Sequence, residues 1–72
     1  MIYQRIRDLR EDRDWNQTTV ANMLHMSQPG YSKYETGEHD IPTQVLIQLA
    51  RIYNTSIDYL LGETSNPTRF KE

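Results

Sequence analysis

The hydrophobic residues of this chain recur at the three- and four-residue spacing of α-helices. Between Ile2 and about Arg13, the apolar positions Ile2, Ile6 and Leu9 fall on one side of a helix. The clearest apolar stripe follows Thr43 and consists of Leu46, Leu49, Ala50 and Tyr53. No segment alternates between apolar and polar residues as a half-buried strand does. The pattern therefore predicts an all-α fold.

Two short helices are predicted between these segments. Asn16 is a good N-cap for a second helix that starts at the next residue, because its side-chain oxygen can accept a hydrogen bond from an unpaired backbone amide. Ser27 is placed to cap a third helix, and Pro29 fits in its first turn, where a missing donor costs nothing. Gly37 is typical of the residue that ends a helix.

Thr43 is predicted to cap the fourth helix, and Ser56 is predicted to cap a short fifth helix that ends at Gly62. Residues 63–72 are polar with one proline, which is typical of a mobile C-terminal tail. The chain is therefore expected to form one compact five-helix domain over residues 1–62, followed by a tail over residues 63–72.

Length and composition agree with a small helical domain. The 72 residues suffice for one modest core, and with no cysteine the chain has neither disulfides nor thiolate metal sites to stabilise it. The first residues lack an apolar signal core, and no run approaches the ~20 apolar residues of a membrane span. We therefore expect a cytoplasmic protein with no membrane contact.

The second and third predicted helices have the layout of a helix-turn-helix. Two helices joined by so short a connection cross steeply and need a small residue where they touch, and Ala21 supplies it. The residues expected to lock them together are Val20, Leu24, Met26, Tyr31 and Tyr34. The third helix, from about Gln28 to Thr36, then points its other face outward. That face carries amide, hydroxyl and ammonium groups suited to phosphates and base edges in a major groove, on Gln28, Pro29, Gly30, Ser32, Lys33 and Thr36.

At this point the sequence resembles a known family. The segment QTTVANMLHMSQPGYSKYETGEHDIPTQVLIQLARIYNTSIDYLLG resembles the helix-turn-helix of lambda-like phage repressors and of the xenobiotic-response-element (XRE) family of bacterial regulators. The likeness extends over nearly the whole chain, from Ile2 to Gly62, and implies a five-helix lambda-repressor-like DNA-binding domain. It also implies a phosphate contact for Gln17 with Asn16 beside it, and base reading by Gln28, Pro29, Gly30, Ser32 and Lys33.

The resemblance implies two further roles. Arg10 and Glu35, which by themselves could be two exposed charges, are implied to form a partly buried ion pair that fastens the first helix to the third. The fifth helix presents Ile57, Tyr59 and Leu60, which are either ordinary core residues or the apolar patch through which two copies pair. One helix face is expected to serve both purposes.

The sequence departs from the family in ways that bear on DNA binding. His25 stands in the turn where glycine is common, so a left-handed residue is expected there at a cost of ~1 kcal/mol. The loop that often presents basic residues to phosphates here carries Glu38, His39 and Asp40. Because Pro29 and Gly30 offer little side chain, base readout is expected to rest on few contacts.

The function expected from these features is sequence-specific DNA binding by a transcriptional regulator, a repressor that binds a pseudo-palindromic operator as a homodimer. The net charge of −2 and the acidic loop keep a second reading open, in which the same fold binds a partner protein as an antitoxin or adaptor does. No enzyme, cofactor or metal site is expected, since the serines lack a plausible base and His25 and His39 lack ligand partners.

Overall fold

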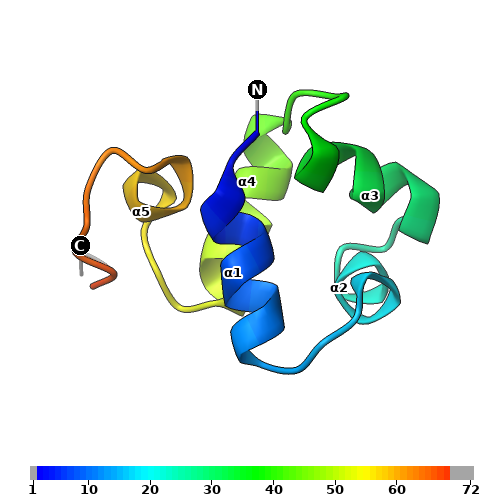
Figure 1. Cartoon of the computed structure of the whole chain (residues 1–72), viewed down its shortest axis with the longest axis horizontal. Coiled ribbons are helices and arrows are strands. Elements are labelled where there is room, and N and C mark those ends of the chain that lie inside the picture. The colour runs from blue at the N-terminus through cyan, green and yellow to red at the C-terminus, as the bar shows by residue number, and fades with distance from the viewer. Residues whose placement is uncertain (1, 69–72) are drawn as a thin grey trace.

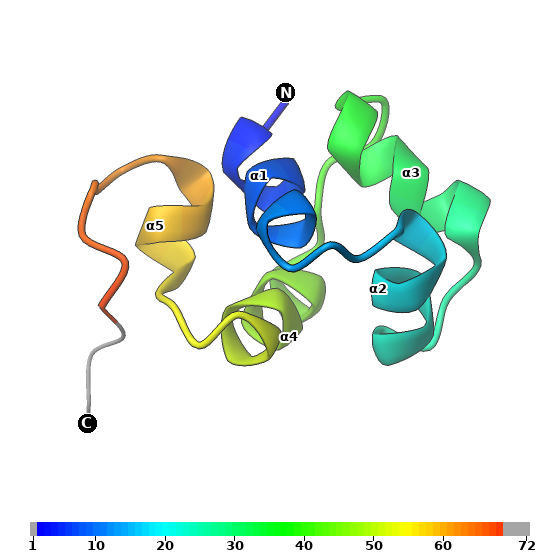
Figure 2. The same cartoon turned by 60° about the horizontal axis from the view of Figure 1, so that its bottom comes forward.

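The computed structural model describes residues 2–68, and over that range it contains five α-helices and no strand. The helices are α1 (Gln4–Asp12), α2 (Gln17–Met23), α3 (Gln28–Thr36), α4 (Thr43–Ile52) and α5 (Ile57–Leu61). Figure 1 shows α1 in the middle, with α2 and α3 on one side and α5 on the other. Figure 2, seen from below, shows α4 running beneath α1 between these two groups. The all-α, five-helix expectation is confirmed.

Local capping explains where three of the helices begin. The side-chain oxygens of the predicted caps accept a hydrogen bond from the backbone N–H three residues on, at 2.8 Å for Asn16, 3.2 Å for Ser27 and 3.0 Å for Ser56. Gly37 and Gly62 end α3 and α5 with a φ of 80°, the left-handed conformation that glycine adopts without steric cost. These predictions are confirmed.

The predicted starts of α1 and α4 are wrong. Helix α1 begins at Gln4, and Ile2 lies before it, outside the helix, with 60% of its surface exposed. Thr43 is the first residue of α4 rather than its cap, because Pro42 takes the N-cap position with φ −60° and ψ 149°. The proline ring fixes φ near this value, and because it has no side-chain acceptor the helix begins without a side-chain cap hydrogen bond.

Each helix contributes buried residues to one core. Ile6, Tyr31, Leu49 and Leu60 have no exposed surface and come from α1, α3, α4 and α5, while α2 supplies Val20 and Ala21. Tyr34 is half-buried, and its ring meets that of Tyr31 edge-on at 6.4 Å between centroids. The apolar stripe of α4 is buried except at its first position, Leu46, which is half-buried. This core fixes α3 against α2.

The turn between α2 and α3 has the predicted left-handed residue. His25 has a φ of 57°, and the amide of Met26 next to it donates to the carbonyl of Ala21 at 3.0 Å. Two other non-glycine residues, Asp14 and Asn54, also have positive φ, at 55° and 51°. A histidine Cβ is crowded in this conformation, so the turn stores a small strain.

Replacing His25 by glycine is expected to raise the free energy of unfolding by about 0.5 to 1 kcal/mol, because the strain at the turn is relieved. Asn54→Gly is the matched control and should gain less, since asparagine tolerates the left-handed region better than most residues. Urea denaturation of the two variants and the wild type measures both effects. An unchanged or lowered stability in His25→Gly would contradict the strain assigned to this turn.

The chain continues along the domain after Gly62, where the sequence predicts a mobile tail. We call residues 63–68 the strap. Arg5 of α1 donates through Nη1 to the Thr64 carbonyl at 2.7 Å, and the Thr55 hydroxyl donates to the Pro67 carbonyl at 2.7 Å. Figures 1 and 2 show the strap beside α5. The rest of the predicted tail, residues 69–72, lies outside the described residues.

Candidate nucleic-acid interface

Helix α3 has one buried and one outward face, as its residue pattern predicts. Tyr31 and Glu35 are buried against the other helices. The outward positions divide into four exposed residues, Gln28, Pro29, Lys33 and Thr36, and two half-buried ones, Gly30 and Ser32. The structure thus brings the predicted base-reading residues together on one surface.

Gly30 allows the first turn of α3 to pack closely on the preceding turn. A Cβ at this position would lie 3.0 Å from the Ser27 hydroxyl and 3.2 Å from the Met26 terminal methyl carbon. The Ser27 hydroxyl is the N-cap of α3, so a larger residue would disturb the cap. The bare stretch formed by Pro29 and Gly30 is therefore a requirement of packing as well as a feature of the outward surface.

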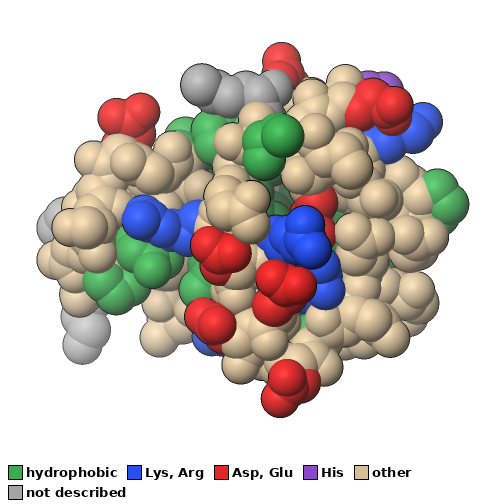
Figure 3. Space-filling view, in the orientation of Figure 1, with side chains coloured by type: hydrophobic (Ala, Val, Ile, Leu, Met, Phe, Trp, Pro, Cys, Tyr) green, Lys and Arg blue, Asp and Glu red, His purple; other side chains and the backbone are tan. Residues whose placement is uncertain are grey.

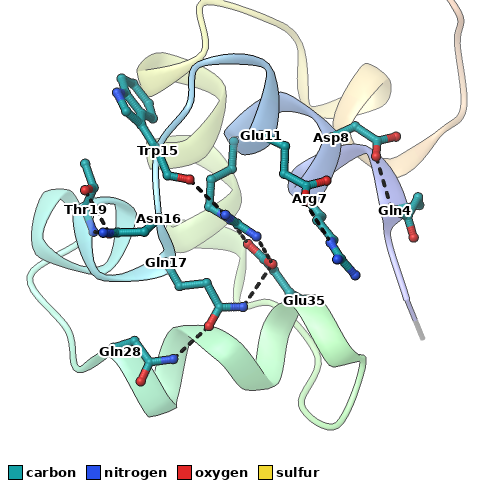
Figure 4. A network of polar contacts seen from close by, with 11 residues as sticks. Gln4, Arg7, Asp8, Glu11, Trp15, Asn16, Gln17, Thr19, Gln28 and Glu35 are labelled. Carbon is teal, nitrogen blue, oxygen red and sulfur yellow. Dashed lines mark hydrogen bonds and ion pairs between the residues drawn. The ribbon is translucent and has the colours of Figure 1, made fainter.

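A chain of side-chain hydrogen bonds runs inward from the start of α3 (Figure 4). Gln28 Nε2 donates to Gln17 Oε1 at 2.7 Å, and Gln17 Nε2 donates to Glu35 Oε1 at 3.1 Å. Gln17, for which the family resemblance implies a phosphate contact, here bonds at both ends of its side-chain amide. It holds the side chain of Gln28 in place. Asn16, beside it, uses Oδ1 to cap α2 and is exposed.

The inner end of this network is the ion pair of Arg10 and Glu35. The guanidinium donates to both carboxylate oxygens, from Nε to Oε2 at 2.7 Å and from Nη2 to Oε1 at 3.0 Å. Its Nη1 donates to the Trp15 carbonyl at 2.8 Å. The two side chains are only 11% and 3% exposed. One guanidinium therefore joins α1 to α3 and to the segment that leads into α2.

The ion pair keeps its charges near neutral pH. Burial has the largest single effect on Glu35 and acts to raise its pKa, but the hydrogen bonds to the carboxylate, led by that from Arg10, together with the positive charge of Arg10 outweigh it, and the pKa ends below its ordinary value. Burial raises the pKa of the neighbouring Tyr31 above its ordinary value, so its phenol stays neutral. Burial likewise raises the pKa of Tyr53 to about 12. The network thus presents a fixed set of donors and acceptors at the pH of a cell.

Few charges lie on the surface formed by α2 and the start of α3. Residues 15–32 contain no Lys, Arg, Asp or Glu. Figure 3 shows charged side chains over α1 and near the end of α3, with an uncharged surface between them on the side of α2. Lys33 is the single basic residue of α3 and is exposed. This surface therefore offers mainly neutral hydrogen-bond donors.

The arginines of α1 and the segment after it are engaged elsewhere. Arg7 forms an exposed ion pair with Glu11 at 3.5 Å. The guanidinium of Arg13 lies 4.9 Å from the centroid of the Tyr53 ring, which in turn packs against Trp15. With Arg10 paired to a carboxylate, the first helix offers little free positive charge.

The acidic loop follows directly after α3. Glu38, His39 and Asp40 are exposed. The amide of His39 donates to the carbonyl of Lys33 at 3.1 Å, and the amide of Glu38 lies 3.4 Å from the Thr36 hydroxyl that accepts from it. The loop is thus tied to the last turn of α3, which places negative charge near Lys33.

The predicted pairing residues of α5 do not all face outward. Leu60 has no exposed surface and packs in the core, so a second copy has no access to it. Ile57 and Tyr59 are half-buried, and the guanidinium of Arg5 lies 4.0 Å from the centroid of the Tyr59 ring. For pairing, the predicted set is reduced to Ile57 and Tyr59.

Within residues 2–68, no group of three or more His, Asp or Glu side chains lies close enough to hold a metal ion. Over the same part of the chain, none of the helices has the length and apolar character needed to cross a bilayer.

Comparison with known proteins places the chain among bacterial and phage regulators. The uncharacterised HTH-type transcriptional regulator YobD of Bacillus subtilis (strain 168) is 34% identical over 67 residues, which are 93% of this chain and 60% of that protein. The HTH-type transcriptional regulator ImmR of the same organism is 33% identical over 60 residues, 83% of this chain and 47% of that protein. The cryptic phage CTXphi transcriptional repressor RstR of Vibrio cholerae is 34% identical over 64 residues, 89% of this chain and 58% of that protein.

The chain spans about three fifths of the length of the first curated relatives it matches, at 60% and 62%. No solved structure matches it significantly. The helix-turn-helix family model matches residues 6–60, which run from the buried Ile6 of α1 to the buried Leu60 of α5. That range includes the turn at His25 and the whole of α3. The chain belongs to the helix-turn-helix family.

Proposed function

We propose that this chain is the DNA-binding domain of a transcriptional regulator that acts as a repressor and reads a specific operator with α3. The observation that carries the proposal is the outward face of α3, whose leading side chain, Gln28, is held by Gln17 and through it by the buried Arg10–Glu35 pair. The similar proteins, which are named as transcriptional regulators and a phage repressor, support it.

Three of the outward residues are proposed to contact bases. Gln28 spends one amide hydrogen on Gln17 and keeps the other, together with its oxygen, for the two-point contact that glutamine makes with adenine. Lys33 can donate to the O6 and N7 acceptors of guanine. Pro29 offers carbon atoms to a thymine methyl. Because the glutamine is already fixed, less freedom is lost on binding.

Two copies are proposed to bind a pseudo-palindromic operator, with half-sites about 34 Å apart, one turn of the duplex. Ile57 and Tyr59 on α5 are the residues proposed to lie at the pairing surface. The domain would act in the cytoplasm by binding alone, without an enzymatic step or a cofactor.

A salt titration tests the proposal. Because Arg10 is paired and Lys33 is the one basic residue of α3, each copy neutralises few phosphates, and a slope of about −2 to −4 in log affinity against log salt is expected for two copies. Operator selected from random duplexes should bind at least ~1000-fold more tightly than a scrambled duplex. The measurement uses both labelled duplexes at several salt concentrations.

A second function is favoured by one observation, the absence of charge over residues 15–32 together with the acidic loop behind α3. Such a surface suits contact with a partner protein. In that case the chain would act as an antitoxin or an adaptor. If selected and scrambled duplexes bind equally at every salt concentration, the DNA-reading proposal fails. The partner should then be sought on the α3 face.

A further inference from the structure

The loop after α3 is fastened to the helix at Lys33. The backbone amide of His39 donates to the Lys33 carbonyl at 3.1 Å, and the Thr36 hydroxyl donates to the same carbonyl at 3.3 Å. The Thr36 hydroxyl also accepts from the amide of Glu38 at 3.4 Å. The left-handed Gly37 turns the chain back at this point. The first residues of the loop therefore stay beside the turn of α3 that carries Lys33.

Glu38 adds a negative charge at this end of α3. Its side chain is exposed, and it belongs to neither of the two ion pairs described above for residues 2–68. The last carbonyls of a helix carry a partial negative charge of their own, to which the carboxylate adds. Figure 3 shows acidic and basic side chains gathered near the end of α3. A phosphate that pairs with Lys33 therefore also meets the charge of Glu38.

Lys33 can donate to two kinds of acceptor on a duplex. A phosphate carries a full negative charge, whereas the O6 and N7 atoms of guanine carry only partial charges. Coulomb repulsion is proportional to charge, so Glu38 disfavours the phosphate contact more than the base contact. Lys33 is the single basic residue of α3, and residues 15–32 have no charged side chain to offset this repulsion. The choice between phosphate and base at Lys33 therefore depends on Glu38.

We propose that Glu38 is a specificity-determining residue: it weakens the contact of Lys33 with phosphates and so directs that side chain to base edges. The hydroxyl of Thr36 supports this role, because it holds the Glu38 amide beside the last turn of α3. The inference rests on the proposed reading of an operator by α3. Removal of the charge should strengthen binding to an unrelated duplex more than binding to the operator.

The test compares three variants with the wild type. Glu38→Gln removes the charge and keeps the size of the side chain, and Glu38→Lys reverses the charge. Glu63→Gln is the matched control, because Glu63 is also exposed but follows α5, on the other side of α1 from α3 (Figure 1). The domain is 32 Å long, and charges are screened over about 10 Å at ~0.1 M salt, so a duplex on α3 should not sense Glu63. Titration of labelled operator and scrambled duplex at ~50 and ~200 mM salt measures the affinities.

At ~50 mM salt, Glu38→Gln is expected to bind the scrambled duplex about threefold more tightly than the wild type, since one like charge is removed near a phosphate. Binding to the operator should gain less than about 1.5-fold, so the preference for the operator falls about twofold. The gain should shrink at ~200 mM salt, because the repulsion is screened. Glu38→Lys should add a phosphate contact, which steepens the salt slope on the scrambled duplex by about 0.9 per copy. Glu63→Gln should match the wild type on both duplexes.

A double-mutant cycle shows whether Glu38 acts on the contact made by Lys33. In Lys33→Gln, no cation of α3 remains to draw a phosphate to this turn. Glu38→Gln made in that background should therefore leave the affinity for the scrambled duplex unchanged within about 1.3-fold. Thermal denaturation of every variant checks the fold, and little change is expected because both side chains are exposed.

The inference is overturned if Glu38→Gln strengthens binding to the two duplexes equally or to neither. It is also overturned if Glu63→Gln has the same effect, since net charge alone then explains the gain, or if the gain persists in Lys33→Gln. Failure of the proposed function gives a different result, because the wild type would then show no operator preference at any salt concentration. The cycle on the scrambled duplex would still decide whether Glu38 weakens the phosphate contact of Lys33.

Discussion

Replacing Glu35 by glutamine is expected to lower the free energy of unfolding by about 3 kcal/mol, because Arg10 is then left as an unpaired charge in a buried site. The two side chains are 11% and 3% exposed, so water cannot replace the lost carboxylate. For a small domain this is a large part of the total stability. Urea denaturation at pH 7 measures the difference.

The matched control is Glu11→Gln, which removes the same charge from an ion pair on the surface of α1. The side chains of Arg7 and Glu11 are 56% and 52% exposed, and the expected loss is below about 0.5 kcal/mol. Equal losses of unfolding free energy in the two variants would show that burial does not make the Arg10–Glu35 pair more important for stability than the exposed pair.

The effect of Glu35 should also depend on pH. Its pKa is lowered in the folded chain, so its stabilising contribution is complete above the unfolded value of about 4.3 and is lost as pH falls through the folded value. The stability difference between wild type and Glu35→Gln is therefore expected to stay constant near neutral pH and to close in acid. A difference that already begins to close as pH falls from neutral towards the unfolded value of about 4.3 would contradict the lowered pKa.

Replacing Gln28 or Lys33 by alanine is expected to weaken operator binding by about 1 to 3 kcal/mol each, or roughly 5- to 150-fold, because each removes a proposed base contact. Both side chains are exposed, so the free energy of unfolding should change little. Titration of the selected operator measures the affinity, and thermal denaturation measures the fold.

The control for these variants is Gln48→Ala, which removes an exposed amide from α4 rather than from α3. It should bind operator as the wild type does. If Gln28→Ala and Lys33→Ala also bind like the wild type, α3 is not the helix that reads DNA.

The beginnings and ends of most helices could be predicted because the signals are local. A hydroxyl or amide such as that of Ser27 caps the helix directly after it, and Gly37 supplies a left-handed residue whatever lies around it. Pro42 was a harder case, because the local capping rules favour the hydroxyl of Thr43, whereas the structure has Pro42 at the N-cap without a side-chain hydrogen bond.

The polar network could be predicted only in part. The partnership of Arg10 and Glu35 followed from the family resemblance, whereas the role of Gln17 did not follow from its helix position. Its two partners lie 11 and 18 residues away along the chain. The periodicity of a helix does not show which residues of another helix lie close to it. The contacts of the strap with Arg5 and Thr55 also join residues that are far apart in the sequence. Such pairs become visible only when the elements are placed in space.

For the proposed DNA reading, the uncharged surface over residues 15–32 has a consequence for how an operator is found. A bacterial chromosome offers at least about 10⁶ competing sites, and attraction to phosphates is what keeps most regulators bound to them. A surface with one lysine per copy is held weakly by such DNA. A larger share of the molecules then diffuses freely, and occupancy of the operator depends on base recognition more than on capture by neighbouring DNA.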